Sequence, residues 1–134
     1  MSVPQEDSLR FALLAPPEVR IGVPVPITLR LTNTGARPVE LHLQGRDIVF
    51  DVVVTREDGA PVWRRLEHAV VPGILQVKVL APGESLELRA QWRQQTSQGD
   101  AAGPGTYTLQ GVLPTDDPQP LRTPPVRVRI TARH

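Results

Sequence analysis

Ile27-Thr28-Leu29-Arg30-Leu31-Thr32 alternates apolar and polar side chains at every position. A period of two turns one set of side chains toward a core and the other toward water, which is typical of an antiparallel β-strand. Apolar residues recur at every second position in further short segments, over residues 9–13, 39–43, 48–54, 75–79, 86–92, 107–113 and 126–130. The pattern therefore predicts an all-β domain with about eight strands, in which residues 75, 77 and 79 belong to the core-facing set.

Turn residues separate these segments. The 134 residues include 15 prolines and 10 glycines, where average usage of about 5% and 7% gives roughly 16 of the two together. Asp58-Gly59 predicts a hairpin between residues 49–56 and 62–65. Asn33-Thr34-Gly35 is expected to supply a positive φ, and Pro82-Gly83-Glu84 to reverse the chain. Strands at about ten-residue spacing favour a β-sandwich or barrel.

Residues 84–98 form the one long stretch without proline or glycine, and they contain good helix formers. Their apolar residues fall at 86, 88, 90 and 92. Side chains at this spacing would be scattered around a helix, but they lie on one face of a strand, so we predict a strand here.

The overall numbers predict a single domain over residues 1–134. A net charge of +1 provides no strong field for nucleic acid or an anionic membrane. The arginines at 122, 127, 129 and 133 lack the interleaved aromatic residues that stack on nucleic-acid bases. No apolar run approaches the roughly 20 residues of a membrane span, and the chain has no cysteine for disulfides. Residues 1–7 lack the features of a secretory signal, which predicts a cytoplasmic protein, or an exported one if a signal peptide has been removed.

Catalytic motifs are absent from the sequence. The histidines at 42, 68 and 134 form no cluster with the spacing of zinc ligands, and no serine lies in a Gly-x-Ser-x-Gly elbow. There is no phosphate-binding loop. We therefore expect a domain that is not an enzyme and that uses no metal or cofactor.

Trp63, Trp92 and Tyr107 are expected to pack in the core. Tyr107 follows Pro104-Gly105-Thr106 at the start of a strand. This is the position of the corner tyrosine of immunoglobulin-like sandwiches, whose hydroxyl bonds back to the chain.

Several motifs occur in a fixed order along residues 22–113: Asn33-Thr34-Gly35, Phe50-Asp51-Val52, Val62-Trp63-Arg64, Pro82-Gly83-Glu84, and Pro104-Gly105-Thr106-Tyr107. In this order and spacing the sequence resembles the BsuPI-type intracellular proteinase inhibitor domain family. The resemblance implies an immunoglobulin-like antiparallel β-sandwich. It also implies a non-enzymatic protein-binding domain that inhibits a subtilisin-like serine protease. The sequence differs from the family at Arg65, where the family typically has a second Trp, and at Val71-Pro72-Gly73, which replaces a Phe-Thr-Gln stretch.

Two connections are candidate protease contacts. An inhibitor presents a stiff extended segment, because ordering a loop on binding subtracts affinity. Within residues 66–74, Val70 and Val71 can fill specificity pockets and Pro72 restrains the chain. Alternatively, these two valines hold the connection onto the core. The second candidate is the proline-rich stretch 114–125, with Leu121 and Arg122 as its exposed tip.

A second interpretation is a non-inhibitory immunoglobulin-like interaction or accessory module, from an exported or cell-envelope protein. Such a module would bind another protein through a sheet edge or a long loop.

Overall fold

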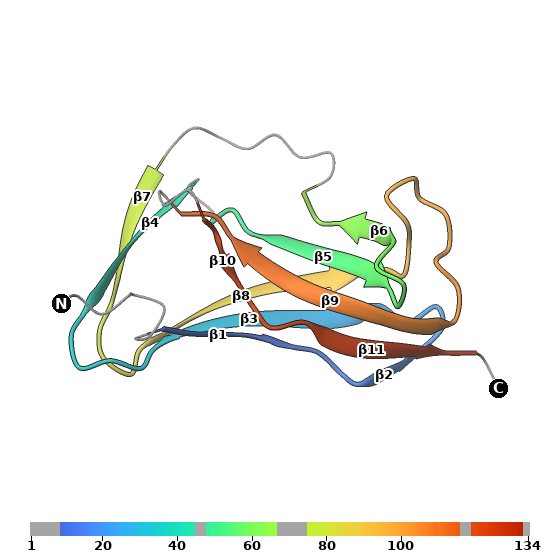
Figure 1. Cartoon of the computed structure of the whole chain (residues 1–134), viewed down its shortest axis with the longest axis horizontal. Helices are drawn as coiled ribbons and strands as arrows, with labels where there is room; N and C mark the ends of the chain where they lie inside the picture. Colours follow the sequence, from blue (N-terminus) through green and yellow to red (C-terminus); the bar gives the residue numbers. More distant parts are fainter. Residues whose placement is uncertain (1–8, 45–47, 67–74, 116–118, 133–134) are drawn as a thin grey trace.

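The computed structural model describes residues 9–44, 48–66, 75–115 and 119–132 (Figure 1). In this part of the chain it contains strands and no helix. The strands are β1 (Leu9–Leu14), β2 (Glu18–Arg20), β3 (Val25–Asn33), β4 (Val39–Gln44), β5 (Asp51–Arg56), β6 (Pro61–Arg64), β7 (Leu75–Leu80), β8 (Ser85–Trp92), β9 (Gly105–Leu113), β10 (Leu121–Arg122) and β11 (Val126–Thr131). The all-β prediction is confirmed, as is the choice of a strand over a helix at residues 85–92.

Two sheets form the body of the molecule (Figure 1). One has the order β1-β3-β8, and the other has the order β2-β11-β9-β5-β6, with β10 beside β9. All these pairs are antiparallel except β2 with β11. The odd-numbered residues of β3, such as Leu29, are buried and their neighbours are partly or wholly exposed, and on β9 the same alternation runs from Thr106 to Gly111 before the strand ends in the buried Val112 and Leu113. The period of two in the sequence therefore identified the core face of the central strands.

An aromatic pair closes one end of the core. Trp92 and Tyr107 meet edge to face, with ring centroids 5.0 Å apart, and both are buried. The hydroxyl of Tyr107 donates hydrogen bonds to the carbonyl oxygens of Ala102 and Gly103, at 2.6 and 2.7 Å. The predicted tyrosine corner is confirmed.

A third ladder, β4 with β7, forms an arm at the opposite end (Figure 1). The β3–β8 ladder ends at the pair Thr32 and Ser85, and the β4–β7 ladder begins at Val39 and Leu80. Because each strand of one ladder leads directly into a strand of the other, the chain turns a corner here. The predicted turn at Pro82-Gly83-Glu84 is present, since the N–H of Glu84 donates to the carbonyl oxygen of Ala81 at 2.9 Å, but the strands that it joins lie in different ladders and do not pair with each other.

Asn33 and Gly83 build this corner. Asn33 is buried, and its amide nitrogen donates to the carbonyl oxygens of Arg37 and Leu80, at 2.7 and 2.9 Å. The positive φ belongs to Gly83, at 80°, whose N–H donates to the carbonyl of Asn33. The expectation of a positive φ at Asn33-Thr34-Gly35 is wrong, because Asn33 acts through its side chain.

The arm also reverses the predicted faces of β7. Val77 and Val79 are 57% and 52% exposed. The alternate residues of β7 share a face with the buried Leu41 and Leu43 of β4. The assignment of Val77 and Val79 to the core is therefore wrong, because β4 supplies the apolar face that packs on the body and β7 turns its valines outward.

Candidate protein-binding site

The first predicted contact, Val70-Val71-Pro72, lies outside the described residues. The structure does describe the residues on either side of it. Leu66 follows β6, and Leu75 begins β7. The described part of the site therefore consists of the residues that hold the two ends of this segment, which we call its anchors.

The Leu66 anchor is a buried carboxylate. Asp51 begins β5 and is 2% exposed. Its Oδ1 accepts hydrogen bonds from the N–H of Val52 and of Leu66, at 2.9 and 3.1 Å. Its Oδ2 accepts from Nε and Nη2 of Arg64, at 2.9 and 2.6 Å. Charge-assisted bonds of this kind are about twice as strong as neutral ones. Asp51 thus fixes the point where the chain leaves β6.

Arg65 reinforces the same anchor. Its guanidinium carbon lies 3.9 Å from the centroid of the Phe50 ring, and its Nη1 donates to the carbonyl of Phe50 at 2.7 Å. Burial of part of the guanidinium lowers the pKa of Arg65, and the Asp51 carboxylate opposes that shift. A planar guanidinium stacks on an aromatic face much as an aromatic ring does. Arg65 therefore packs on the ring of Phe50.

The Leu75 anchor lies at the tip of the β4–β7 arm. Leu75 pairs with Gln44, and the adjacent residue Leu43 forms a bridge to Thr115. Thr115 lies at the start of the second predicted contact, residues 114–125. The end of one predicted segment and the start of the other are thus attached to neighbouring residues of β4.

Leu121 and Arg122 form β10, paired with Leu113 and Val112 of β9. Leu121 is half-buried and packs against the core, while Arg122 is exposed. The prediction of an exposed loop tip is therefore wrong for Leu121, because β9 offers it a strand partner. It is correct for the exposure of Arg122.

Val112 connects the two predicted contacts. It pairs with Arg122 on one side and with Asp51 on the other. Neighbouring strands lie about 4.8 Å apart, so Arg122 and Asp51 are separated by about 10 Å. The anchor of residues 66–74 and the second candidate contact therefore occupy one end of the same sheet.

Asp51 and Arg65 are the residues that sequence reasoning missed. The signal for Asp51 was an acidic residue inside the otherwise apolar stretch 48–54, where an unpaired charge would be costly. No comparable signal marks Arg65, because its partner Phe50 is distant in sequence.

Within the described ranges, no three His, Cys, Asp or Glu side chains lie together as a metal site would require. No described helix is long and apolar enough to cross a membrane. The described residues that characterise this part of the molecule are the buried carboxylate of Asp51, the exposed side chains of Arg64 and Arg122, and the exposed Val77 and Val79 of the arm.

Residues 15–118 match the family described as BsuPI, intracellular proteinase inhibitor. The chain belongs to this family. The family is described as an intracellular proteinase inhibitor, which is consistent with the expected domain that is not an enzyme and agrees with the cytoplasmic location predicted above. No curated protein matches the chain.

Solved structures are similar to this BsuPI domain in fold. An alkylpurine DNA glycosylase of Pseudomonas fluorescens has a TM-score of 0.52 and 12% identity, covering 93% of this chain and 31% of that one. A CARDB domain of Pyrococcus furiosus has a TM-score of 0.50 and 13% identity, covering 93% and 94%. A β-glucosidase of Erythrobacter marinus has a TM-score of 0.48 and 14% identity, covering 92% and 15%. The chain thus spans less than a third of the glycosylase and of the glucosidase. The likeness to the CARDB domain supports an immunoglobulin-like sandwich and shows nothing of activity.

Proposed function

We propose that this domain inhibits a subtilisin-like serine protease, with residues 66–74 as the segment that enters the protease cleft. Membership of the proteinase inhibitor family is the observation that carries the proposal. Val70 and Val71 fill specificity pockets, and Pro72 limits the freedom of the chain between them and β7. Leu121 and Arg122, at the same end of the sheet, are the second candidate contact.

The anchors on both sides of the segment favour this role. Leu66 is held by Asp51, and Leu75 is paired with Gln44. Fixing the ends of a loop lowers the conformational freedom that binding must remove, and so raises affinity without adding a contact. In a chain with no cysteine, an ion pair to a buried carboxylate and a strand ladder take the place of disulfides.

The outward face of β7 extends the proposed contact. Val77 and Val79 lie on β7, the strand that follows residues 66–74, and are more than half exposed. Adjacent apolar side chains exposed on one strand face form the kind of patch that marks protein–protein contacts. The edge of a protease bound to residues 66–74 would lie against this face of β7.

Substitution of Val70 by aspartate tests the assignment. Val70→Asp places a charge in an apolar specificity pocket, and we expect it to abolish inhibition while the melting temperature stays nearly unchanged. Val23→Asp is the matched control, because Val23 is 46% exposed and follows β2 rather than β6. It should inhibit like the unmodified protein. Unchanged inhibition by Val70→Asp would exclude this contact.

A large fall in the melting temperature of Val70→Asp would instead place Val70 against the core. If neither the unmodified protein nor Val23→Asp inhibits, the alternative of a non-inhibitory interaction module replaces the proposal.

A further inference from the structure

The two sheets are joined along one side by a chain segment that changes sheets. β1 pairs with β3 in the first sheet, and β2, which follows it, pairs with β11 in the second. On the second sheet, β10 and β11 lie one after the other along the same side of β9. The sandwich is thus closed between β2 and β11. Between β1 and β10, no strand pairing is found in the described part of the chain.

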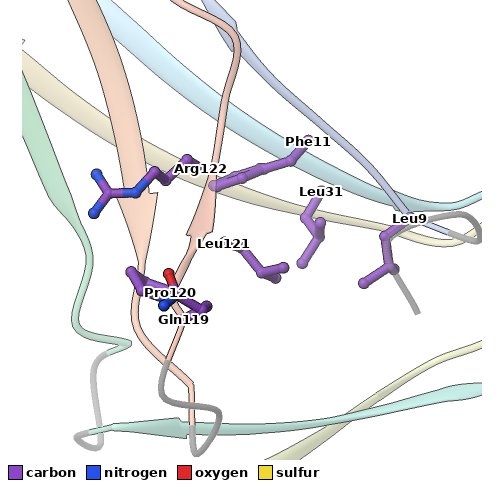
Figure 2. Close-up of a pocket in the computed structure, with 7 residues that line it drawn as sticks. All are labelled: Leu9, Phe11, Leu31, Gln119, Pro120, Leu121 and Arg122. Atoms are coloured by element: carbon purple, nitrogen blue, oxygen red, sulfur yellow. The ribbon is translucent and has the colours of Figure 1, made fainter. Parts of the chain in front are cut away.

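A hollow of about 290 Å³ lies at this opening (Figure 2). The buried Leu31 belongs to its lining, together with Leu9 and Phe11 of β1 and Leu121 of β10. Figure 2 shows Leu9, Leu31 and Leu121 converging, with the guanidinium of Arg122 directed away from them. The volume is near the lower end of small-molecule pockets, about 300–1,000 Å³, and suits an amino-acid side chain.

Main-chain groups of β1 are available along the same opening. Asn33 donates its N–H to Glu84 beyond β8, so the alternate residues of β3 bond toward β1. The residues of β1 that complete those bonds are Arg10, Ala12 and Leu14. The N–H and C=O groups of Leu9 and Phe11 therefore point away from β3, at an edge that pairs with no other described strand. Such an edge can pair with an added strand.

Arg122 provides a positive charge next to the hollow. Its side chain is exposed, and no carboxylate among the described residues lies within ion-pair distance of it. The flanking prolines 120 and 124 lack an N–H, which makes β10 a poor template for strand addition and leaves β1 as the pairing edge.

We propose that this opening binds an extended acidic segment of another protein. The segment pairs with the edge of β1, places one apolar side chain in the hollow, and sets a carboxylate against Arg122. Side chains two residues apart point to the same face of an extended chain, so the matching sequence has an apolar residue and an acidic residue at that spacing. The inference goes beyond protease inhibition and does not depend on it.

Fluorescence anisotropy with a labelled peptide, acetyl-Thr-Leu-Thr-Glu-Thr-amide, tests the proposal without any protease. We expect saturable binding that weakens at least tenfold when the peptide Glu is replaced by Lys. Arg122→Glu should invert this preference, weakening the Glu peptide at least tenfold and strengthening the Lys peptide. Arg127→Glu is the matched control, because Arg127 is an exposed arginine of the adjacent strand β11. It should leave the affinity within twofold.

Leu9→Trp provides an independent test, because a larger side chain at this half-buried position fills the hollow. It should prevent binding of both peptides in a protein that still unfolds cooperatively. The proposal is overturned if no peptide binds, if Arg122→Glu and Arg127→Glu have equal effects, or if Leu9→Trp binds normally. A concentration-dependent dimer that Leu9→Trp abolishes would assign the opening to a second copy of the chain, and would also overturn it.

Discussion

Arg64 on β6 donates two hydrogen bonds to one carboxylate oxygen of Asp51 on β5, through Nε at 2.9 Å and Nη2 at 2.6 Å. The two partners differ greatly in exposure: the side chain of Arg64 is 53% exposed and that of Asp51 is 3% exposed. Removing Arg64 therefore has a different physical consequence from removing the charge of Asp51. A buried carboxylate cannot return to water when its cation is lost, whereas an exposed guanidinium can.

We accordingly predict that Arg64→Ala destabilises the domain more than Asp51→Asn. Arg64→Ala removes the guanidinium that donates two hydrogen bonds to the buried carboxylate, at a cost of about 3–5 kcal/mol. Asp51→Asn keeps the shape and loses charge-assisted bonds, at about 1–3 kcal/mol. Equilibrium urea unfolding of the two variants measures the difference. The reverse order would show that the carboxylate is solvated or otherwise paired.

Arg65→Lys should not behave as a conservative change. Lysine loses the planar group stacked on Phe50 and the fixed donor to its carbonyl, and we expect a loss of about 1–2 kcal/mol in the free energy of unfolding. Arg65→Trp should retain the stacking on Phe50. Arg127→Lys serves as the control, within about 0.5 kcal/mol of the unmodified protein. Equal stabilities for Arg65→Lys and Arg127→Lys would show that the stacking is not stabilising.

Substitutions in the aromatic pair should differ in cost, because one removes a whole buried side chain with its hydrogen bond to Gln95 and the other removes only a hydroxyl. Trp92→Ala removes a fully buried side chain and should cost about 3–5 kcal/mol. Tyr107→Phe removes only the hydroxyl that bonds to Ala102 and Gly103, and should cost about 1–2 kcal/mol. Thermal unfolding followed by circular dichroism ranks the two variants. A loss under about 1 kcal/mol for Trp92→Ala would contradict its burial.

Glu87 should make the stability of the domain weakly dependent on pH. A hydrogen bond from Arg30, together with the charge of Arg30, lowers the pKa of Glu87 below its usual value. A lowered folded-state pKa stabilises the folded protein above the usual carboxylate range, and this contribution disappears as pH falls through the folded-state value. The unmodified protein should exceed Glu87→Gln in melting temperature at neutral pH, and the two should converge once the pH falls below the folded-state pKa of Glu87. A difference that persists in acid would contradict this linkage.

The sequence predicts a strand well where one face of that strand packs on the core and the other faces water. Period-two alternation located β3, β8 and β9 correctly because each packs one face on the core. It misassigned Val77 and Val79 because the buried face of the arm carries Leu41 and Leu43 of β4 and the alternate residues of β7. β2 and β10 were missed because strands of three and two residues carry no periodic signal. They form only because β11 and β9 offer unpaired edges.

The candidate site was predicted only in part for a similar reason. A sequence shows which connections are long and stiffened by proline, and so it indicated residues 66–74 and 114–125. It does not show that Val112 lies between Asp51 and Arg122, because that register depends on pairings between distant strands. The anchoring role of Asp51 follows from the same long-range geometry.

The most direct test of protease inhibition is a titration. Purified domain is added to a subtilisin-like protease acting on a chromogenic peptide, and the domain is then examined by mass spectrometry. We predict a saturable loss of protease activity, with the domain either intact or cut once within residues 66–74. Undiminished activity at a large excess of the domain, or cleavage at many positions along the chain, would contradict the account.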